Sequence, residues 1–175
     1  MQGLSIRPRG REHRCRHDDT MQRCVYRFLG LMFTGILAGC SGRDVPTVAP
    51  NVTAQQQTDA AQSMGLMFPP STQFLLYHRY TGGPDDAIHL KISLPAPALA
   101  QFLAQRLLAS AQWDSARRFV DDMPSWPQWQ PSKASQFRSA QLHVPKAEVL
   151  NVLIDDGAAG DGGGSVTVYL MWHQT

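Results

Sequence analysis

One alternating stretch decides the fold of this chain: Ile88-His89-Leu90-Lys91-Ile92-Ser93-Leu94. Its apolar side chains recur at every second residue, and this period places them on one face of a β-strand with the polar side chains on the other. Such a strand is typical of an antiparallel sheet that covers its apolar face with a second layer. On this pattern, we expect His89 to face solvent.

The flanking sequence places this strand in a hairpin that is followed by a helix. Residues 73–80 are rich in aromatic side chains and precede Gly82-Gly83-Pro84, a turn signal, so they predict the first strand of the hairpin. Pro97 suits the first turn of a helix, where no amide donor is needed. We expect this helix to span residues 97–110, because apolar residues follow at helical spacing: Leu99, Phe102, Leu103 and Leu107.

Three later segments also predict strands: residues 136–144, 147–154 and 165–173. Between the helix and these strands, residues 111–135 hold several prolines, which exclude a long regular element. We expect only a short helical turn there, at residues 115–120. The whole order predicts an α+β domain, with an antiparallel sheet of about four to five strands and one main helix packed on a face, as a two-layer sandwich.

The amino-terminal part has the layout of a signal peptide. Arg23 and Arg27 precede an uncharged apolar run, residues 28–39, whose small residues gather at its end. Twelve residues of helix cover about 18 Å, well short of the roughly 30 Å hydrocarbon core of a membrane, which argues against a permanent transmembrane helix. A leader that starts at Met21 has a more usual length than one that starts at Met1, so we expect Met21 to be the true start.

The apolar run ends in Leu37-Ala38-Gly39-Cys40, which resembles the lipobox of bacterial lipoproteins. In that family the thiol receives a diacylglyceryl group, and the signal peptidase cuts on its amino side. The resemblance implies that Cys40 is lipidated and that two or three acyl chains anchor the protein stably in a membrane. Ser41 stands where an Asp commonly retains such proteins in the inner membrane, which implies the periplasmic face of the outer membrane.

The next segment has the composition of a flexible linker. Residues 41–63 are rich in Gln, Ala, Ser, Thr and Pro and hold hardly a large apolar side chain. We therefore expect a signal peptide over residues 1–39, a lipid-anchored flexible linker over residues 40–68 and a small α+β domain over residues 69–175. This layout also resembles small uncharacterised envelope lipoproteins, a resemblance that implies no activity.

Charge and cysteine content exclude further classes of partner. The net charge of +2 comes from the leader, because seven Arg and three acidic residues lie in residues 1–39 and leave nine basic and eleven acidic residues after the cut. We therefore expect no nucleic-acid partner. Cys15 and Cys24 fall in the leader and Cys40 carries lipid, so no thiol remains for a disulfide or a metal site.

The best candidate for metal binding is an acidic, glycine-rich loop. Its carboxylates, from Asp155, Asp156 and Asp161, are ligands that calcium prefers. Their spacing matches no EF-hand loop, and no closing Glu follows. We therefore predict a solvated connection between two strands, with no metal and no cofactor.

Histidines and their acidic neighbours are the remaining candidates for chemistry. Asp86 lies close enough in sequence to orient His89 for acid–base catalysis, but Asp85 and Asp86 after a Pro are more typical of a turn. His78, His143 and His173 join His89 in a metal site only if the strands bring them together, and no metal-binding motif supports one. Without a Gly-x-Ser-x-Gly motif either, we expect no enzyme.

Trp126 and Trp129 lie in the irregular segment and allow two interpretations. They form a rigid apolar surface that binds a protein or a glycan, or they close the open end of a small core. We expect a non-catalytic, membrane-anchored envelope lipoprotein with a protein-binding or structural role. The alternative is an inhibitor or immunity lipoprotein against a cell-wall hydrolase or toxin, and an envelope hydrolase is a distant third. The oligomeric state stays open.

Overall fold

One antiparallel sheet organises the part of the chain that the computed structural model describes, residues 45–81, 85–145, 148–159 and 164–174. These residues belong to the second of two compact units, residues 42–175. The predicted leader, Cys40 and Asp161 lie outside the described residues. None of the helices described there has the length and apolar character that a membrane span needs.

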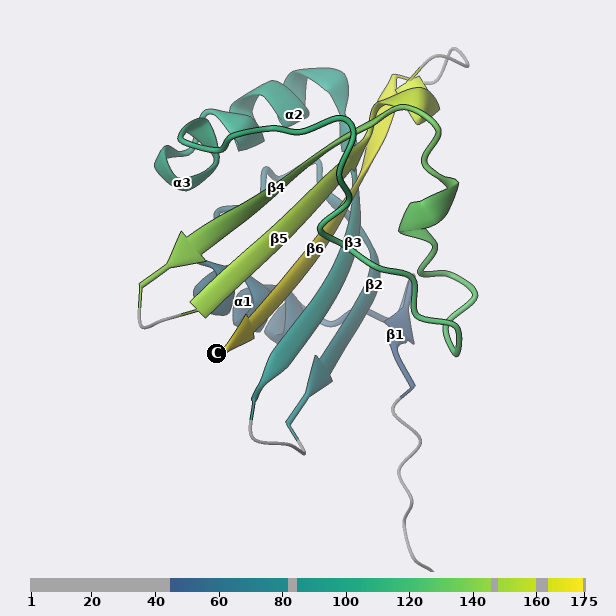
Figure 1. The fold of residues 1–175 in the computed structure, drawn as a ribbon. Helices are drawn as coiled ribbons and strands as arrows, with labels where there is room; N and C mark the ends of the chain where they lie inside the picture. Colours follow the sequence, from purple (N-terminus) through teal and green to yellow (C-terminus); the bar gives the residue numbers. More distant parts are fainter. Residues whose placement is uncertain (1–44, 82–84, 146–147, 160–163, 175) are drawn as a thin grey trace, which may run out of the picture. The chain divides into compact units, whose positions relative to one another are not determined.

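The sheet has the strand order β1-β2-β3-β6-β5-β4 within the described residues (Figure 1). Its strands are β1 (Thr47–Val48), β2 (Gln73–Tyr80), β3 (Ala87–Pro95), β4 (Phe137–Val144), β5 (Glu148–Asp155) and β6 (Ser165–Gln174). The predicted hairpin of β2 and β3 and the three later strands are confirmed. The sheet has six described strands instead of four to five, because β1 adds a short edge strand to β2.

The predicted helix over residues 97–110 is divided in two. The helix α2 (Ala96–Leu103) ends before Gln105, whose backbone is extended, and a short α3 (Arg106–Ala109) follows. The Gln105 side chain explains this break, because it accepts a hydrogen bond from the Met67 N–H and donates one to the Met67 carbonyl, each 2.7 Å long. The described 3-10 turns are η1 (Pro131–Lys133) and η2 (Asp156–Ala159).

The helical turn expected at residues 115–120 is wrong. The chain there has bends at residues 115–116 and 119–120 and no helix, and Asp114 instead forms a bridge with Ser139 of β4. The Asp114 carboxylate accepts hydrogen bonds from the N–H groups of Ala116 and Arg117. These bonds satisfy backbone donors locally, so the segment needs no helix.

The predicted flexible linker is also wrong over its described part. Residues 54–64 form an α-helix, α1 (Ala54–Met64), which begins with a capping box at Thr53 and ends at Gly65 with φ 63°. Ala60 and Met64 are fully buried in the core. The composition misled because only two side chains of α1 need to be buried to dock it, while caps at both ends stabilise its backbone.

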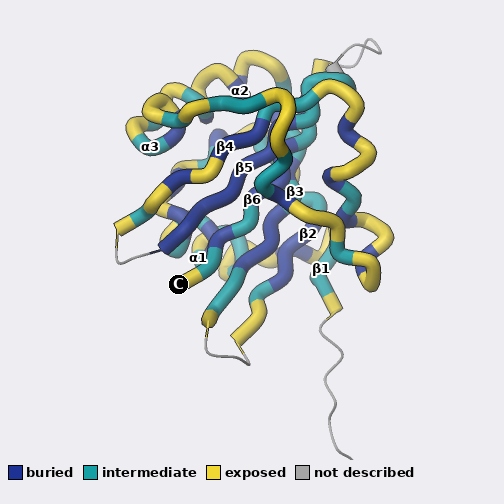
Figure 2. Tube along the Cα trace, viewed as in Figure 1, coloured by how far each residue is buried: buried dark blue, intermediate teal, exposed yellow. Residues whose placement is uncertain are grey.

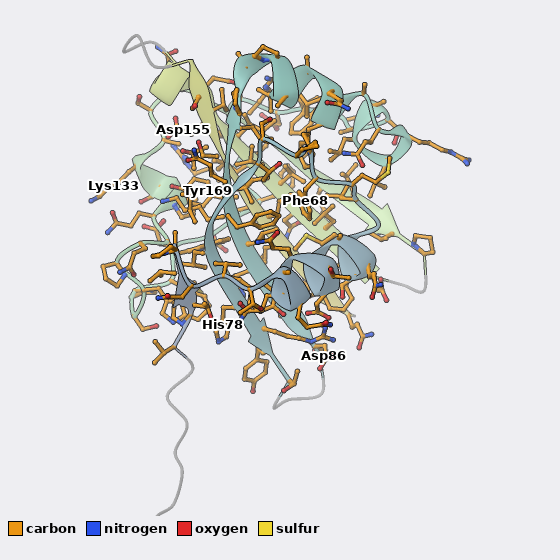
Figure 3. All side chains as sticks on the ribbon, turned by 180° about the vertical axis from the view of Figure 1, so that it is seen from behind. Phe68, His78, Asp86, Lys133, Asp155 and Tyr169 are labelled. Atoms are coloured by element: carbon orange, nitrogen blue, oxygen red, sulfur yellow. The ribbon has the colours of Figure 1, made fainter. Side chains whose placement is uncertain are left out.

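One face of the sheet packs against the helices. Ile88, Trp172 and Leu150 lie side by side across β3, β6 and β5, and such rows form the main core. Helix α1 lies behind the sheet in Figure 1 and in front of it in Figure 3. From α2, Phe102 enters the same core and stacks on Phe68 at 5.9 Å between ring centroids. Each large side chain buried here contributes about 1.5–3 kcal/mol.

The opposite face carries a second core, which corrects the two-layer expectation. There the irregular segment of residues 111–135 crosses the sheet, in front of it in Figure 1. Its Val120, Trp126 and Trp129 pack on Leu153 and Tyr169 of the sheet. Figure 2 shows the consequence, because strands β3 and β5 are buried along most of their length. The domain therefore has a helical layer, a sheet and an irregular covering segment.

Candidate functional site

The sheet face beneath the irregular segment holds a cluster of aromatic and imidazole rings. His78 of β2 lies directly opposite His89 of β3. The Trp126 ring centroid is 4.3 Å from that of His78 and 5.2 Å from that of His89. Trp129 lies 5.3 Å from His89 and 5.3 Å from Tyr169, nearly perpendicular to both rings. We call these five residues the aromatic cluster.

Hydrogen bonds fix the covering segment in this position. The Trp129 indole N–H donates to the Asp121 carbonyl at 2.9 Å, and Lys91 Nζ donates to the Gln128 carbonyl at 2.8 Å. Lys91 also lies 5.0 Å from the centroid of the Tyr169 ring, a cation–π distance. Burial raises the pKa of Tyr169 to about 12, and the nearby Asp155 and Asp122 add to the increase. Tyr169 therefore stays neutral and packs as an apolar ring.

Burial decides between the two interpretations of the tryptophans. Trp129 is fully buried and Trp126 is 5% exposed. Of the two interpretations, burial favours the second: the indoles of Trp126 and Trp129 close the core on this face of the sheet and do not form an exposed binding surface. Sequence reasoning left this open because a Trp–Pro segment has the same composition in both roles.

His89 departs most from its predicted environment. It is only 6% exposed, although the alternating pattern placed it on the solvent face. Burial lowers the pKa of His89 to about 4, with smaller contributions from His78 and His173. Its Nδ1 atom has no hydrogen-bond partner among the described residues. Neutral His89 thus fills space between the two tryptophans.

Asp86 and His89 do not form an acid–base pair. Asp86 accepts a hydrogen bond of 3.1 Å from Arg79 Nη2, and Arg79 Nη1 bonds Asp59 of α1 at 2.5 Å. The Tyr77 hydroxyl donates to the same Asp59 carboxylate, and burial and this bond raise the pKa of Tyr77. These contacts tie α1 to the helix-side face, whereas His89 lies under the tryptophans on the other face.

The other candidate ligands also serve local structure. The Asp155 carboxylate accepts a hydrogen bond from the Gly157 N–H, and Asp156 forms an ion pair with Arg138 at 3.2 Å. Asp155 and Tyr169 lie near one another in Figure 3, on neighbouring strands. Among the described residues, no three His, Cys, Asp or Glu side chains come together to hold a metal ion, and this applies to His143 and His173 as well.

Sequence reasoning missed a surface hollow of about 340 Å³ beside α1. The ring of Phe68, labelled in Figure 3, packs edge-on against Phe74 at 5.2 Å and forms one wall. The full lining is Ala54, Gln57, Thr58, Ala61, Phe68, Pro69, Pro70, Thr72 and Phe74. The two prolines between aromatic residues were a signal for it, but only the docking of α1 completes the wall.

Comparisons with known proteins assign no family to these features. No protein-family model matches the chain, and no curated protein or solved structure matches it either.

Proposed function

We propose that the protein is a lipid-anchored envelope lipoprotein whose domain has a non-catalytic, protein-binding role at the membrane surface. The observation that carries this proposal is Leu37-Ala38-Gly39-Cys40, placed directly after an uncharged apolar run. Two or three acyl chains on Cys40 anchor the protein stably, whereas one chain binds a membrane only marginally. The proposed location is the periplasmic face of the outer membrane, because Ser41 follows the lipidated residue.

The start of the domain sharpens this proposal. Val45 is the first described residue, and β1 begins at Thr47. Val45 lies five residues after Cys40, and five fully extended residues span at most about 18 Å. A lipidated Cys40 therefore holds the domain close to the lipid surface. Partners that are themselves embedded in or attached to that membrane fit this position best.

The burial and the contacts of the described candidate side chains support a non-catalytic role. A general base needs a partner within hydrogen-bond reach and access to substrate. His89 is buried under two indoles, and Asp86 is engaged by Arg79. Both have structural roles that account for their positions.

The experiment that tests the proposal is Cys40→Ala in the full chain. We expect an unprocessed precursor of lower mobility that incorporates no labelled palmitate and is lost from the outer-membrane fraction. Cys24→Ala is the matched control, because it removes a thiol from the leader and should leave processing and labelling intact. A Cys40→Ala protein that is cut and membrane-bound like the unaltered chain would exclude the proposed anchor.

A further inference from the structure

Strand β4 lies at the edge of the sheet, and part of its outer side is open. Ser139 exchanges two backbone hydrogen bonds of 2.8 Å with Asp114, so its main-chain groups point away from β5. Main-chain groups alternate in direction along a strand, so those of Gln141 and His143 point outward as well. No described residue bonds to them on that side. We call residues 140–144 the β4 edge.

The β4 edge has few of the features that prevent strand pairing. Edge strands are usually protected by lysines, prolines, bulges or a covering segment. At the opposite edge of the sheet, β2 has an irregularity between Phe74 and Leu76 and is covered in part by β1. The β4 edge reads Ala-Gln-Leu-His-Val, has unbroken pairing to β5, and keeps Gln141 and His143 exposed.

We propose that the β4 edge pairs with the β4 edge of a second copy of this chain, antiparallel and centred on Leu142. In this register Gln141 lies opposite His143 of the second copy, and His143 lies opposite its Gln141. Each such pair exchanges two backbone hydrogen bonds, so the two edges form four. The result is a continuous sheet through both domains.

The ends of the edge determine the register. Asp114 already occupies the position beside Ser139, so pairing cannot extend past Ala140. In the second copy the residue that reaches this point is Pro145, which has no N–H to donate and lies in the turn that leads back to β5. In this register the pairing therefore ends where Asp114 blocks one strand and where Pro145 begins the turn in the other. A register centred on His143 instead places Gln141 opposite Pro145 and loses a donor from each of these pairs.

Charge and chain direction also fit a second copy. Residues 139–145 include no Asp, Glu, Lys or Arg, so the twofold arrangement brings no like charges together. The strand β1, the described element nearest in sequence to Cys40, lies at the far edge of the sheet from β4. The described part of each chain therefore begins at the edge of its domain that is away from the proposed contact.

The contact is too small for a soluble dimer. Stable interfaces bury about 800 Å² on each partner, which is more than five strand residues supply. Confinement to one membrane surface raises the effective concentration of the second copy and offsets this deficit. In this respect the pairing rests on the proposed function, because lipidation of Cys40 supplies the confinement.

Disulfide trapping in membranes tests the pairing. Two differently tagged full chains, each with Cys15→Ala and Cys24→Ala, carry Gln141→Cys in one and His143→Cys in the other. Both positions are exposed, so neither change disturbs the core. In the proposed register the two Cα atoms are about 5.5 Å apart, within the disulfide range. Two copies of the same variant place their Cys Cα atoms about 8 Å apart, beyond that range.

We expect mild oxidation to give a disulfide-linked dimer, at least tenfold more abundant when the two variants are co-expressed than when either is expressed alone. The chain without either new Cys measures any linkage through Cys40, and palmitate labelling is measured in the same samples. Labelled protein with no mixed dimer, or with equal linkage in the single variants, overturns the pairing and leaves the anchor intact. A mixed dimer without labelling supports the pairing of the two edges, overturns the anchor and shows that the pairing needs no confinement by Cys40 lipidation, and the absence of both overturns both.

Discussion

At the scale of single residues, the protonation of His89 opposes folding. The folded chain holds its pKa at about 4, whereas an unfolded His titrates near 6.5. Below pH 6.5 the unfolded state binds a proton that the folded state does not, so the free energy of unfolding falls as the pH decreases towards 4. We expect a loss of roughly 2 kcal/mol between pH 7 and pH 5 from this residue. Urea unfolding at a series of pH values measures it.

The matched pair for this measurement is His89→Leu and His143→Leu. Because Nδ1 of His89 has no partner among the described residues, Leu can replace the ring without leaving a polar group unpaired. His89→Leu should flatten the pH dependence between pH 7 and pH 5. His143→Leu is the control for the loss of one His side chain elsewhere on the sheet, because His143 is exposed on β4. An equal slope in the His89→Leu protein and the unaltered chain would contradict the assignment.

His89 also shows where local patterns stop being informative. The alternation at residues 88–94 predicted the strand and its helix-side face, because both depend only on neighbouring residues. The burial of His89 depends on Trp126 and Trp129, which approach it from a segment more than thirty residues further along the chain. The alternating pattern of residues within β3 carries no information on that contact. For the same reason, the sequence could not tell a Trp surface from a Trp cover.

At the scale of elements, α1 is stabilised at its ends as well as by its small apolar face. The Thr53 hydroxyl accepts a hydrogen bond from the Gln56 N–H at 3.3 Å, and the Gln56 side chain accepts one from the Thr53 N–H at 2.9 Å. The Gln56 amide also donates to Thr47 of β1. This capping box was readable as Thr-x-x-Gln followed by Gly65, but a composition rich in Gln and Ala pointed to a linker.

Thr53→Ala should therefore lower the free energy of unfolding by about 1 kcal/mol, the usual effect of removing an N-cap. Its control, Thr58, lies five residues further along the chain, inside the helix. The Thr58 hydroxyl bonds back to the Ala54 carbonyl from an exposed position, so Thr58→Ala should be neutral or slightly stabilising. Chemical denaturation compares the two. Equal effects would mean that the box does not stabilise α1.

At the scale of the whole molecule, the domain boundary has a direct energetic consequence. A fragment that starts at residue 69, the boundary expected from composition, lacks β1, α1 and the buried side chains of Val52, Met64 and Leu66. Three such side chains contribute roughly 5–9 kcal/mol together. Domains of this size are stable by only about 5–15 kcal/mol in total. The stabilisation that the missing segment contributes is therefore comparable with the whole free energy of unfolding.

We expect residues 42–175 to unfold in one cooperative urea transition, and residues 69–175 to show none. Without α1, the helix-side face of β2 and β3 is uncovered, and Arg79 loses its Asp59 partner. The shorter fragment should keep some secondary structure in circular dichroism but lose the near-ultraviolet signal of packed tryptophans, since the tryptophan cover rests on the same sheet. If residues 69–175 unfolded cooperatively at the same urea midpoint as residues 42–175, α1 would be an appendage and the shorter boundary would be correct.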